Sequence, residues 1–219
     1  MSALEIVVVD YHKGNLLSVA RSMSAVGAGI EVSDDPDVIA KADGIILPGV
    51  GSFEDATSYL RESGQADAIV RSVRAGTPFL GICLGLQVIF ARGHEHSDSS
   101  AWGNGWIPGL GLLPGSVTKL ESDRLKVPHV GWDQIHFTEH GRQCPLFVDV
   151  SEGANVYFTH SYALGDDVPE GTVCAYTHYT RSFPSAVWKG NIFGVQFHPE
   201  KSSGTGKQIL SNFLRVVRG

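Results

Sequence analysis

Residues 78–87 read PFLGICLGLQ, and we expect the fold to be organised around the turn that they contain. The apolar run 79–82 is typical of a buried strand, and the helix-forming run 86–92 follows it. Gly81 and Gly85 flank Cys83, and their missing side chains allow a strand and a helix to cross closely at a strained turn. The same layout with serine is the nucleophile elbow. The pattern therefore predicts that the Cys83 sulfur stands clear of the sheet at a helix N-terminus, which favours a thiolate.

A nucleophilic thiolate needs a base, and the base needs a group that orients it. Residues 192–197 are typical of a strand, His198 follows them, and Glu200 comes two positions later across Pro199. Alternate residues of an extended segment point to the same side, so the Glu200 carboxylate can reach the His198 ring. Taken singly, such residues are more often a packing cysteine, a structural histidine and a solvated carboxylate. Together they predict a Cys83–His198–Glu200 triad.

Composition excludes several classes of protein. The chain has 219 residues and a net charge of −6, which fits a single α/β domain over residues 1–219 without a basic surface for nucleic acid. No apolar run approaches the roughly 18–20 residues that span a bilayer, and the N-terminal residues do not resemble a signal peptide. Cys83, Cys144 and Cys174 make no even disulfide framework, so we expect a cytoplasmic protein. The nine histidines show no metal-ligand spacing, and we expect neither metal nor cofactor.

The order of elements predicts an α/β fold. In the first half, strands are expected at 4–9, 30–32, 44–47 and 79–82, and helices at 16–26, 38–41, 65–75 and after a capping box formed by Ser52 and Asp55. Short links between them predict a doubly wound, mostly parallel sheet with helices on both faces. In the second half, strands are expected at 116–120, 128–137, 155–158, 173–176 and 185–188, before a closing helix at 207–217. They predict a mixed or antiparallel extension of the sheet.

The loop at residues 48–51, Pro-Gly-Val-Gly, follows the third expected strand. Such a loop is either an ordinary strand-to-helix turn or a backbone that turns its N–H groups toward a ligand, as an oxyanion hole requires. Parallel sheets bind ligands at their C-terminal edge, where this loop and Cys83 are both expected. Trp132 leaves a similar choice between a core residue, the usual place of tryptophan, and an exposed aromatic anchor.

The motif Gly81-x-Cys83-x-Gly85, together with residues 197–200 (FHPE), resembles the class I, or triad, glutamine amidotransferases. The resemblance covers essentially the whole chain and implies an enzyme that hydrolyses L-glutamine and passes the ammonia to a synthase partner. It implies an oxyanion hole made by the Val50–Gly51 region and the N–H of Leu84. It further implies substrate contacts from four residues, with Glu95 on the α-ammonium group and the backbone near Ser161 and Tyr162 on the α-carboxylate; the four are Gln87, Glu95, Ser161 and Tyr162.

Three further segments resemble the branch of this family that serves histidine biosynthesis: PGVG at 48–51, KVPHVGW at 126–132 and PEKS at 199–202. This resemblance implies a heterodimer with a (β/α)₈-barrel cyclase that uses the ammonia to form imidazole glycerol phosphate and an aminoimidazole carboxamide ribotide. It implies an interface that includes Asn15, Trp132 and Lys201. It also implies low activity until the partner binds, which needs two backbone states of the loop that Gly49 and Gly51 permit.

The chain departs from that branch at His12, Lys13 and Asp133, where asparagine is usual for the last, and in the long segment 93–111. Three alternatives stay open. The chain could serve another synthase, such as a nucleotide-sugar amidotransferase, or it could be a non-enzymatic binding subunit that retains the fold. It could also hydrolyse another small amide, although Gln87 and Glu95 suit the zwitterion of an amino acid.

Overall fold

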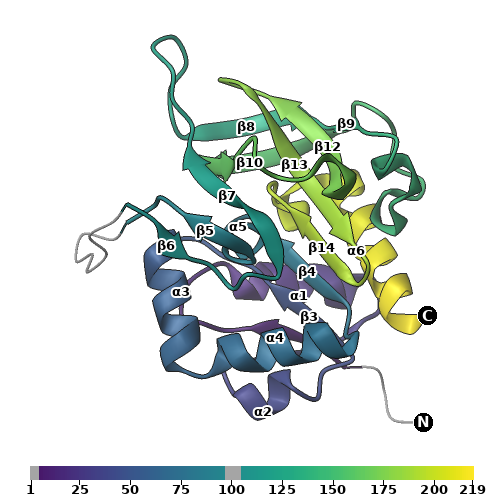
Figure 1. Ribbon diagram of the computed structural model, residues 1–219. Coiled ribbons are helices and arrows are strands. Elements are labelled where there is room, and N and C mark those ends of the chain that lie inside the picture. Colours follow the sequence, from purple (N-terminus) through teal and green to yellow (C-terminus); the bar gives the residue numbers. More distant parts are fainter. Residues whose placement is uncertain (1–4, 97–104) are drawn as a thin grey trace.

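A computed structural model describes residues 5–96 and 105–219, and its centre is a sheet of eight strands (Figure 1). The strands follow the order β2-β1-β3-β4-β14-β13-β12-β9. Their bounds are β1 Glu5–Val9, β2 Gly29–Ser33, β3 Gly44–Leu47, β4 Phe79–Ile82, β9 His136–Phe137, β12 Val173–His178, β13 Ser182–Lys189 and β14 Ile192–Val195. The first five strands of this order are parallel to their neighbours, and β13, β12 and β9 continue the sheet with antiparallel pairing. The predicted sheet and its antiparallel extension are both present.

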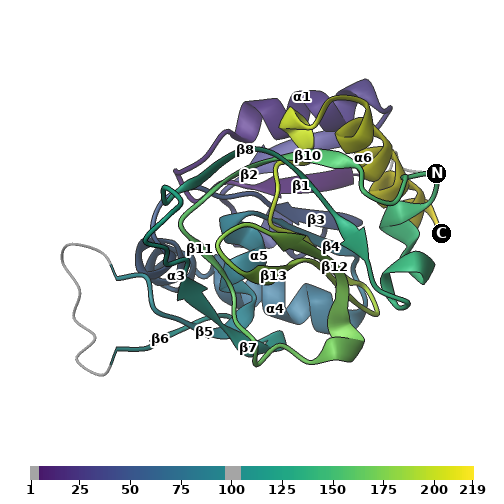
Figure 2. The same cartoon turned by 90° about the horizontal axis from the view of Figure 1, so that it is seen from above.

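Helices cover both faces of this sheet, as predicted. Figure 2 shows α1 and α6 along one face and α4 on the other. The helices are α1 Leu16–Ala25, α2 Pro36–Ile39, α3 Phe53–Glu62, α4 Gln65–Ala75, α5 Leu84–Val88 and α6 Ser203–Arg218, with 3₁₀ turns η1 Gly141–Gln143, η2 Pro145–Phe147, η3 Glu170–Thr172 and η4 Pro199–Lys201. The Ser52 side chain accepts a hydrogen bond from the Asp55 N–H at 3.2 Å and starts α3 as expected.

Continuous apolar strands supply two separate cores. Along β1, Val7 and Val9 pack with α3 and α4, whereas Ile6 and Val8 pack with α1 and α6. Because successive side chains of a strand point to opposite faces, a strand buried on both sides must be apolar at every position. The strands that lead to the loops of the C-terminal edge are therefore packed on both faces.

Two smaller sheets flank the main one, in the orders β10-β8 and β11-β7-β5-β6. Their strands are β5 Phe90–Gly93, β6 Ile107–Pro108, β7 Leu113–Lys119, β8 His129–Gln134, β10 Asn155–His160 and β11 Tyr162–Leu164. The prediction of one strand over 128–137 was wrong, because the chain divides at Ile135. That side chain turns into the core, fully buried, so β8 pairs with β10 while β9 joins the edge of the main sheet.

The predicted helix at 86–92 was also wrong in its second half. Helix α5 ends at Val88, and Phe90 already pairs with Leu113 in the ladder between β5 and β7. The run from Val88 to Phe90 is β-branched and aromatic, and its burial in the core favours the strand over the local helix pattern. Among the residues that the structure describes, no helix is long and apolar enough to cross a lipid bilayer.

Candidate active site

Cys83 occupies a strained turn between β4 and α5. Its φ of 55° lies in the left-handed region, which a non-glycine residue adopts only at a cost. A side-chain carbon on Gly81 would come within 2.7 Å of the Gly85 carbonyl oxygen, and one on Gly85 would collide with the carbonyl oxygen of Leu47. The two glycines are therefore required by the close crossing of β4, α5 and β3, as the sequence predicted.

His198 lies beside this turn, three residues after β14 ends at Val195, and Glu200 lies in the 3₁₀ turn η4. The expected extended segment from His198 to Glu200 was therefore wrong, because Pro199 begins a 3₁₀ turn, and this turn brings the carboxylate to the ring. The His198 Nδ1 atom is 2.9 Å from the Glu200 Oε1 atom, and the two side chains are 4% and 2% exposed. Within the described chain no well-formed hydrogen bond engages His198 Nε2, which leaves this ring nitrogen for the sulfur and the substrate. Burial alone lowers the pKa of His198, but the charge of Cys83 and the charge and hydrogen bond of Glu200 outweigh it and raise the pKa to about 10.

An imidazolium is thus the stable form of His198 when the Cys83 sulfur is anionic. Helix α5, which begins directly after Cys83, has only five residues, whereas the sequence pattern predicted a longer helix. Cys83 is itself only 5% exposed, and its sulfur lies 3.5 Å from Gln196 Nε2 and 3.8 Å from the Thr159 carbonyl oxygen. The three predicted triad residues therefore meet in one buried arrangement that can activate a thiol.

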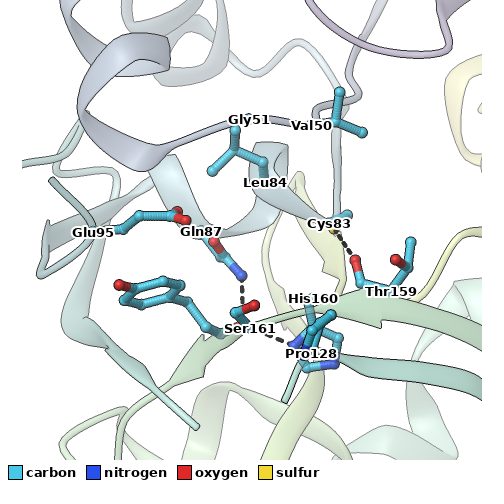
Figure 3. A pocket seen from close by; sticks show the side chains of 11 residues that line it. Val50, Gly51, Cys83, Leu84, Gln87, Glu95, Pro128, Thr159, His160 and Ser161 are labelled. Atoms are coloured by element: carbon cyan, nitrogen blue, oxygen red, sulfur yellow. Dashed lines mark hydrogen bonds between the residues drawn. The ribbon is translucent and has the colours of Figure 1, made fainter. Parts of the chain in front are cut away.

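A cavity of about 260 Å³ opens in front of the sulfur (Figure 3). Eight of the residues that line it were selected from the sequence: Val50, Gly51, Cys83, Leu84, Gln87, Glu95, Ser161 and Tyr162. Pro128, Thr159 and His160 complete the lining. Figure 3 shows the Val50–Gly51 loop on one side of Cys83 and the strand with Thr159 and Ser161 on the other. Residues from four distant parts of the chain thus enclose a space fit for a small molecule.

The two segments selected as oxyanion donors lie against each other. A side-chain carbon on Gly49 would stand 2.9 Å from the Leu84 Cβ atom and 3.2 Å from the Gly85 nitrogen, so the loop approaches the start of α5 closely. Gly51 has φ 104° and permits a turn that other residues avoid. The loop and the start of α5 are therefore in close contact at the cavity that Cys83 lines.

Gln87 is held by a network in which Gln196 was not foreseen. The Gln87 amide nitrogen donates to the Tyr162 carbonyl oxygen at 2.8 Å and to Gln196 Oε1 at 3.0 Å. Gln196, fully buried, thereby links Gln87 to the Cys83 sulfur. The sequence offered a signal, since Gln196 precedes His198 by two positions at the end of the strand expected over 192–197.

Glu95 lies at the far end of the cavity from the triad, at the boundary of β5. Its Oε2 atom accepts a hydrogen bond from the Phe53 N–H at 3.0 Å. Burial raises the pKa of Glu95 to about 7, helped by the charge of Asp55 and opposed by the Phe53 bond. A carboxylate held in a partly desolvated cavity suits a bound ammonium group.

The segment opposite the loop, from the end of β10 to the start of β11, lines the cavity with Thr159, Ser161 and Tyr162. It is fixed by His160, whose Nδ1 atom lies 2.8 Å from the Tyr162 carbonyl oxygen. The other ring nitrogen of His160 is buried without a hydrogen bond in the described chain.

Two of the three residues expected at a partner interface belong to one patch. Trp132 is 53% exposed, and its ring meets that of Tyr157 edge to face at 6.1 Å. The Lys201 ammonium lies 5.7 Å from the centre of the same Tyr157 ring. The exposed Asn15 precedes α1, and its side chain makes no capping bond there. Trp132 is thus an exposed aromatic residue and not a core residue.

The departures noted in the sequence are mostly surface features. The Lys13 ammonium pairs with Asp55 at 2.8 Å, and the exposed His12 ring lies 3.7 Å from Asp10. Asp133 lies 3.5 Å from the buried ring of His129. In segment 93–111, residues 97–104 lie outside the described part of the chain.

Cys144 and Cys174 are buried and unoxidised, and a hydrogen bond with Cys144 raises the pKa of the Cys174 thiol. Within residues 5–96 and 105–219, no cluster of histidine, cysteine or acidic side chains has the arrangement of a metal site.

Comparison with known proteins agrees with this site. Residues 7–217 match the family model "Glutamine amidotransferase class-I". The imidazole glycerol phosphate synthase subunit HisH of Gloeobacter violaceus is 47% identical over 210 residues, which cover 95% of this chain and 88% of that protein. The protein of the same name from Moorella thermoacetica is 44% identical, with 97% and 95% covered.

Solved structures with the same fold are more distant in sequence. PurLQS from Thermotoga maritima has a TM-score of 0.69 at 18% identity, covering 98% of this chain and 99% of that one. The glutaminase domain of CTPS from Trypanosoma brucei has a TM-score of 0.64 at 17% identity, with 97% and 94% covered. At these identities the solved structures show only that the fold is shared. The match to the family model and the relatives of 44% and 47% identity show the family. The chain belongs to the class-I glutamine amidotransferase family.

Proposed function

We propose that this chain is the glutaminase subunit of imidazole glycerol phosphate synthase, which hydrolyses L-glutamine to glutamate and supplies the ammonia for histidine biosynthesis. The observation that carries the proposal is the buried contact of His198 with Glu200, at 2.9 Å, beside Cys83 and a cavity lined by Gln87 and Glu95. The high identity to proteins named as this subunit supports the choice within the family.

In the proposed reaction, the Cys83 thiolate attacks the carbon of the glutamine side-chain amide while His198 holds the thiol proton. The carbonyl oxygen becomes an oxyanion, which the N–H of Leu84 and those of the Val50–Gly51 loop stabilise. His198 then gives its proton to the amide nitrogen, the carbon–nitrogen bond breaks, and ammonia leaves a thioester on Cys83. Water, deprotonated by His198, releases glutamate and restores the thiol.

Substrate orientation follows from charge. We assign the α-ammonium group to the Glu95 carboxylate and the α-carboxylate to backbone N–H groups near Ser161 and Tyr162. The Gln87 amide nitrogen is engaged by Tyr162 and Gln196, so we expect the side chain of Gln87 to act mainly by shaping the cavity. The reaction itself needs no metal or cofactor in this scheme.

Ammonia is lost as a nucleophile once it is protonated in water, so a protected route to a second active site is expected. We propose a heterodimer with a (β/α)₈-barrel cyclase that covers the cavity side. The exposed patch of Trp132 and Lys201 around Tyr157, with Asn15 at the start of α1, is our candidate contact surface. Large aromatic side chains exposed on a surface are the usual anchors of protein interfaces. We expect the complex to work in the cytoplasm, with residues 1–219 as one domain.

The test is glutamate release from glutamine by the purified chain, alone and with the cyclase and its ribulosyl ligand. We expect strong stimulation by the liganded cyclase, and loss of turnover in Cys83→Ala with an unchanged circular dichroism spectrum. Cys144→Ala, which removes another buried thiol, is the matched control and should retain turnover.

Each outcome separates the alternatives. Turnover that survives Cys83→Ala would show that the nucleophile is assigned wrongly. Activity that ignores the cyclase would keep the triad and assign the chain to another synthase. No turnover under either condition would favour a binding subunit without enzymatic activity.

A further inference from the structure

Tyr11, just after β1, is a buried residue that the proposed reaction has not used. Its side chain is 2% exposed and packs in the core beneath the loop at 48–51. The hydroxyl group donates a hydrogen bond of 3.4 Å to the Val50 carbonyl oxygen. Tyr11 does not line the cavity in front of Cys83, whereas Val50 and Gly51 do. The phenol therefore holds the loop from the side opposite the substrate.

The same hydroxyl group also lies next to the second oxyanion element. A side-chain carbon on Gly49 would collide with the Tyr11 hydroxyl oxygen and would stand 2.9 Å from the Leu84 Cβ atom. The Tyr11 hydroxyl, Gly49 and Leu84 thus meet at one point. Burial, followed by the charge of Cys83, raises the pKa of Tyr11, so the hydroxyl keeps its proton and remains a donor throughout the pH range of the reaction.

Further contacts fix the segment that carries Tyr11. The buried Gln65 amide nitrogen donates to the Asp10 carbonyl oxygen at 2.9 Å and to the Asp34 carbonyl oxygen at 3.0 Å. The Lys13 stem lies over Gly51, where an added side-chain carbon would be 3.3 Å from Lys13 Cδ. The residues around Tyr11 are therefore held on the sheet and are in a position to hold the loop.

We infer that Tyr11 is a positioning residue of the oxyanion hole, whose hydroxyl sets the direction of the Val50–Gly51 peptide and whose ring sets its separation from Leu84. In a trans peptide the carbonyl and the following N–H point in opposite directions. Because the Val50 carbonyl turns toward Tyr11, the Gly51 N–H is directed away from it. This inference rests on the proposed function, since it concerns the oxyanion of glutamine hydrolysis.

Tyr11→Phe removes the hydroxyl while the ring continues to fill the core. In the complex with the liganded cyclase, we expect kcat for glutamine to fall about three- to tenfold, the worth of one hydrogen bond, with KM within twofold. Tyr59→Phe is the matched control, because Tyr59 also packs against this core cluster, whereas the hydrogen bond to Val50 comes from Tyr11. We expect it to retain wild-type kcat.

A second readout separates positioning from a general loss of structure. The aldehyde analogue of glutamine, with –CHO in place of the carboxamide, accepts the Cys83 thiol: a carbon–sulfur bond forms, and the carbonyl oxygen takes the negative charge or the thiol proton. Its inhibition constant should rise in Tyr11→Phe by the same factor as kcat falls. The inhibition constant of glutamate, which forms no tetrahedral adduct, should stay unchanged.

An unchanged or increased kcat in Tyr11→Phe would overturn the inference, and so would equal weakening of both inhibitors. Failure of the proposed function gives a different result, because the wild-type complex itself would then show no turnover of glutamine.

Discussion

Glu200→Gln removes the charge that faces His198 but keeps the shape of the side chain. The pair is buried, at 4% and 2% exposed, with 2.9 Å between Nδ1 and Oε1, so solvent screens it little. Glutamine can still accept from the ring N–H, or it can turn its NH₂ group toward the ring and favour the wrong tautomer. Either way the imidazolium loses its negatively charged partner.

The size of the effect follows from the type of hydrogen bond. A bond to a charged group contributes about 1.5–3 kcal/mol and a neutral one about 0.5–1.5 kcal/mol, so the difference is about 1–2 kcal/mol. One pKa unit corresponds to about 1.4 kcal/mol, so the pKa of His198, about 10 in the native chain, should fall by about one unit. Because His198 transfers protons in the proposed reaction, kcat/KM should fall at least about tenfold.

The assay is an NMR titration of ¹³C-labelled histidine in both proteins, combined with glutamate release in the cyclase complex. Glu152→Gln is the matched control: Glu152 Oε1 lies 3.1 Å from His136 Nδ1, but this pair is exposed and neither residue lines the cavity. That variant should keep full activity. An unchanged pKa of His198 in Glu200→Gln would refute the reasoning, whatever the rate does.

Three further variants test other parts of the structure. Burial and the charge of Asp55 raise the pKa of Glu95 to about 7, so protonation below that pH should raise KM for glutamine up to about tenfold per pH unit. In Glu95→Gln, KM should be high and independent of pH. A wild-type KM that does not change with pH would contradict the contact between Glu95 and the substrate. Gly206→Ala places a carbon against the Pro199 carbonyl oxygen and should lower Tm by several degrees. Gly204→Ala is the control, because an added carbon there would have nothing within 4 Å, and its Tm should not fall. Equal Tm values for the two variants would contradict the close packing of α6 against Pro199. Trp132→Ala should weaken cyclase binding at least about 30-fold, a typical loss for an aromatic anchor. Val148→Ala, at a residue 50% exposed, should stay within twofold, and equal losses would argue against the patch.

Local sequence patterns predicted the elements of the first half well. Continuous apolar strands and amphipathic helices such as 65–75 carry their own signal, because each residue of the pattern has the burial that the pattern requires. The second half was predicted less well. Ile135 breaks what reads as one strand, because its burial in the core of the α6 face decides which sheet each side joins. Such choices depend on contacts between distant segments and leave little trace in the local pattern.

The residues of the candidate site also differ in how far the sequence alone predicted them. Spacing alone selected Cys83, His198 and Glu200, since Cys83 lies between two glycines that allow a close crossing and Pro199 separates His198 from Glu200. Gln196 and Tyr11 were missed because glutamine and tyrosine are ordinary residues whose position, beside the sulfur and beneath the loop, comes from pairing between strands. The glycine pattern of residues 48–51 left the choice between an ordinary turn and an oxyanion loop open, and only the resemblance to a family favoured the second, because backbone groups have no residue type.

Two buried histidines near the sulfur show why the environment decides which residue carries protons. His160 and His198 are 7% and 3% exposed, so burial lowers the pKa of both. For His160 burial prevails: the Tyr162 carbonyl oxygen opposes it only partly, nearby positive groups add to it, and the pKa falls to about 3. For His198 the sulfur and the Glu200 carboxylate reverse the balance and raise the pKa to about 10. His160 therefore stays neutral and fixes the backbone, while His198 alone can take a proton from a thiol and return it to a leaving amine.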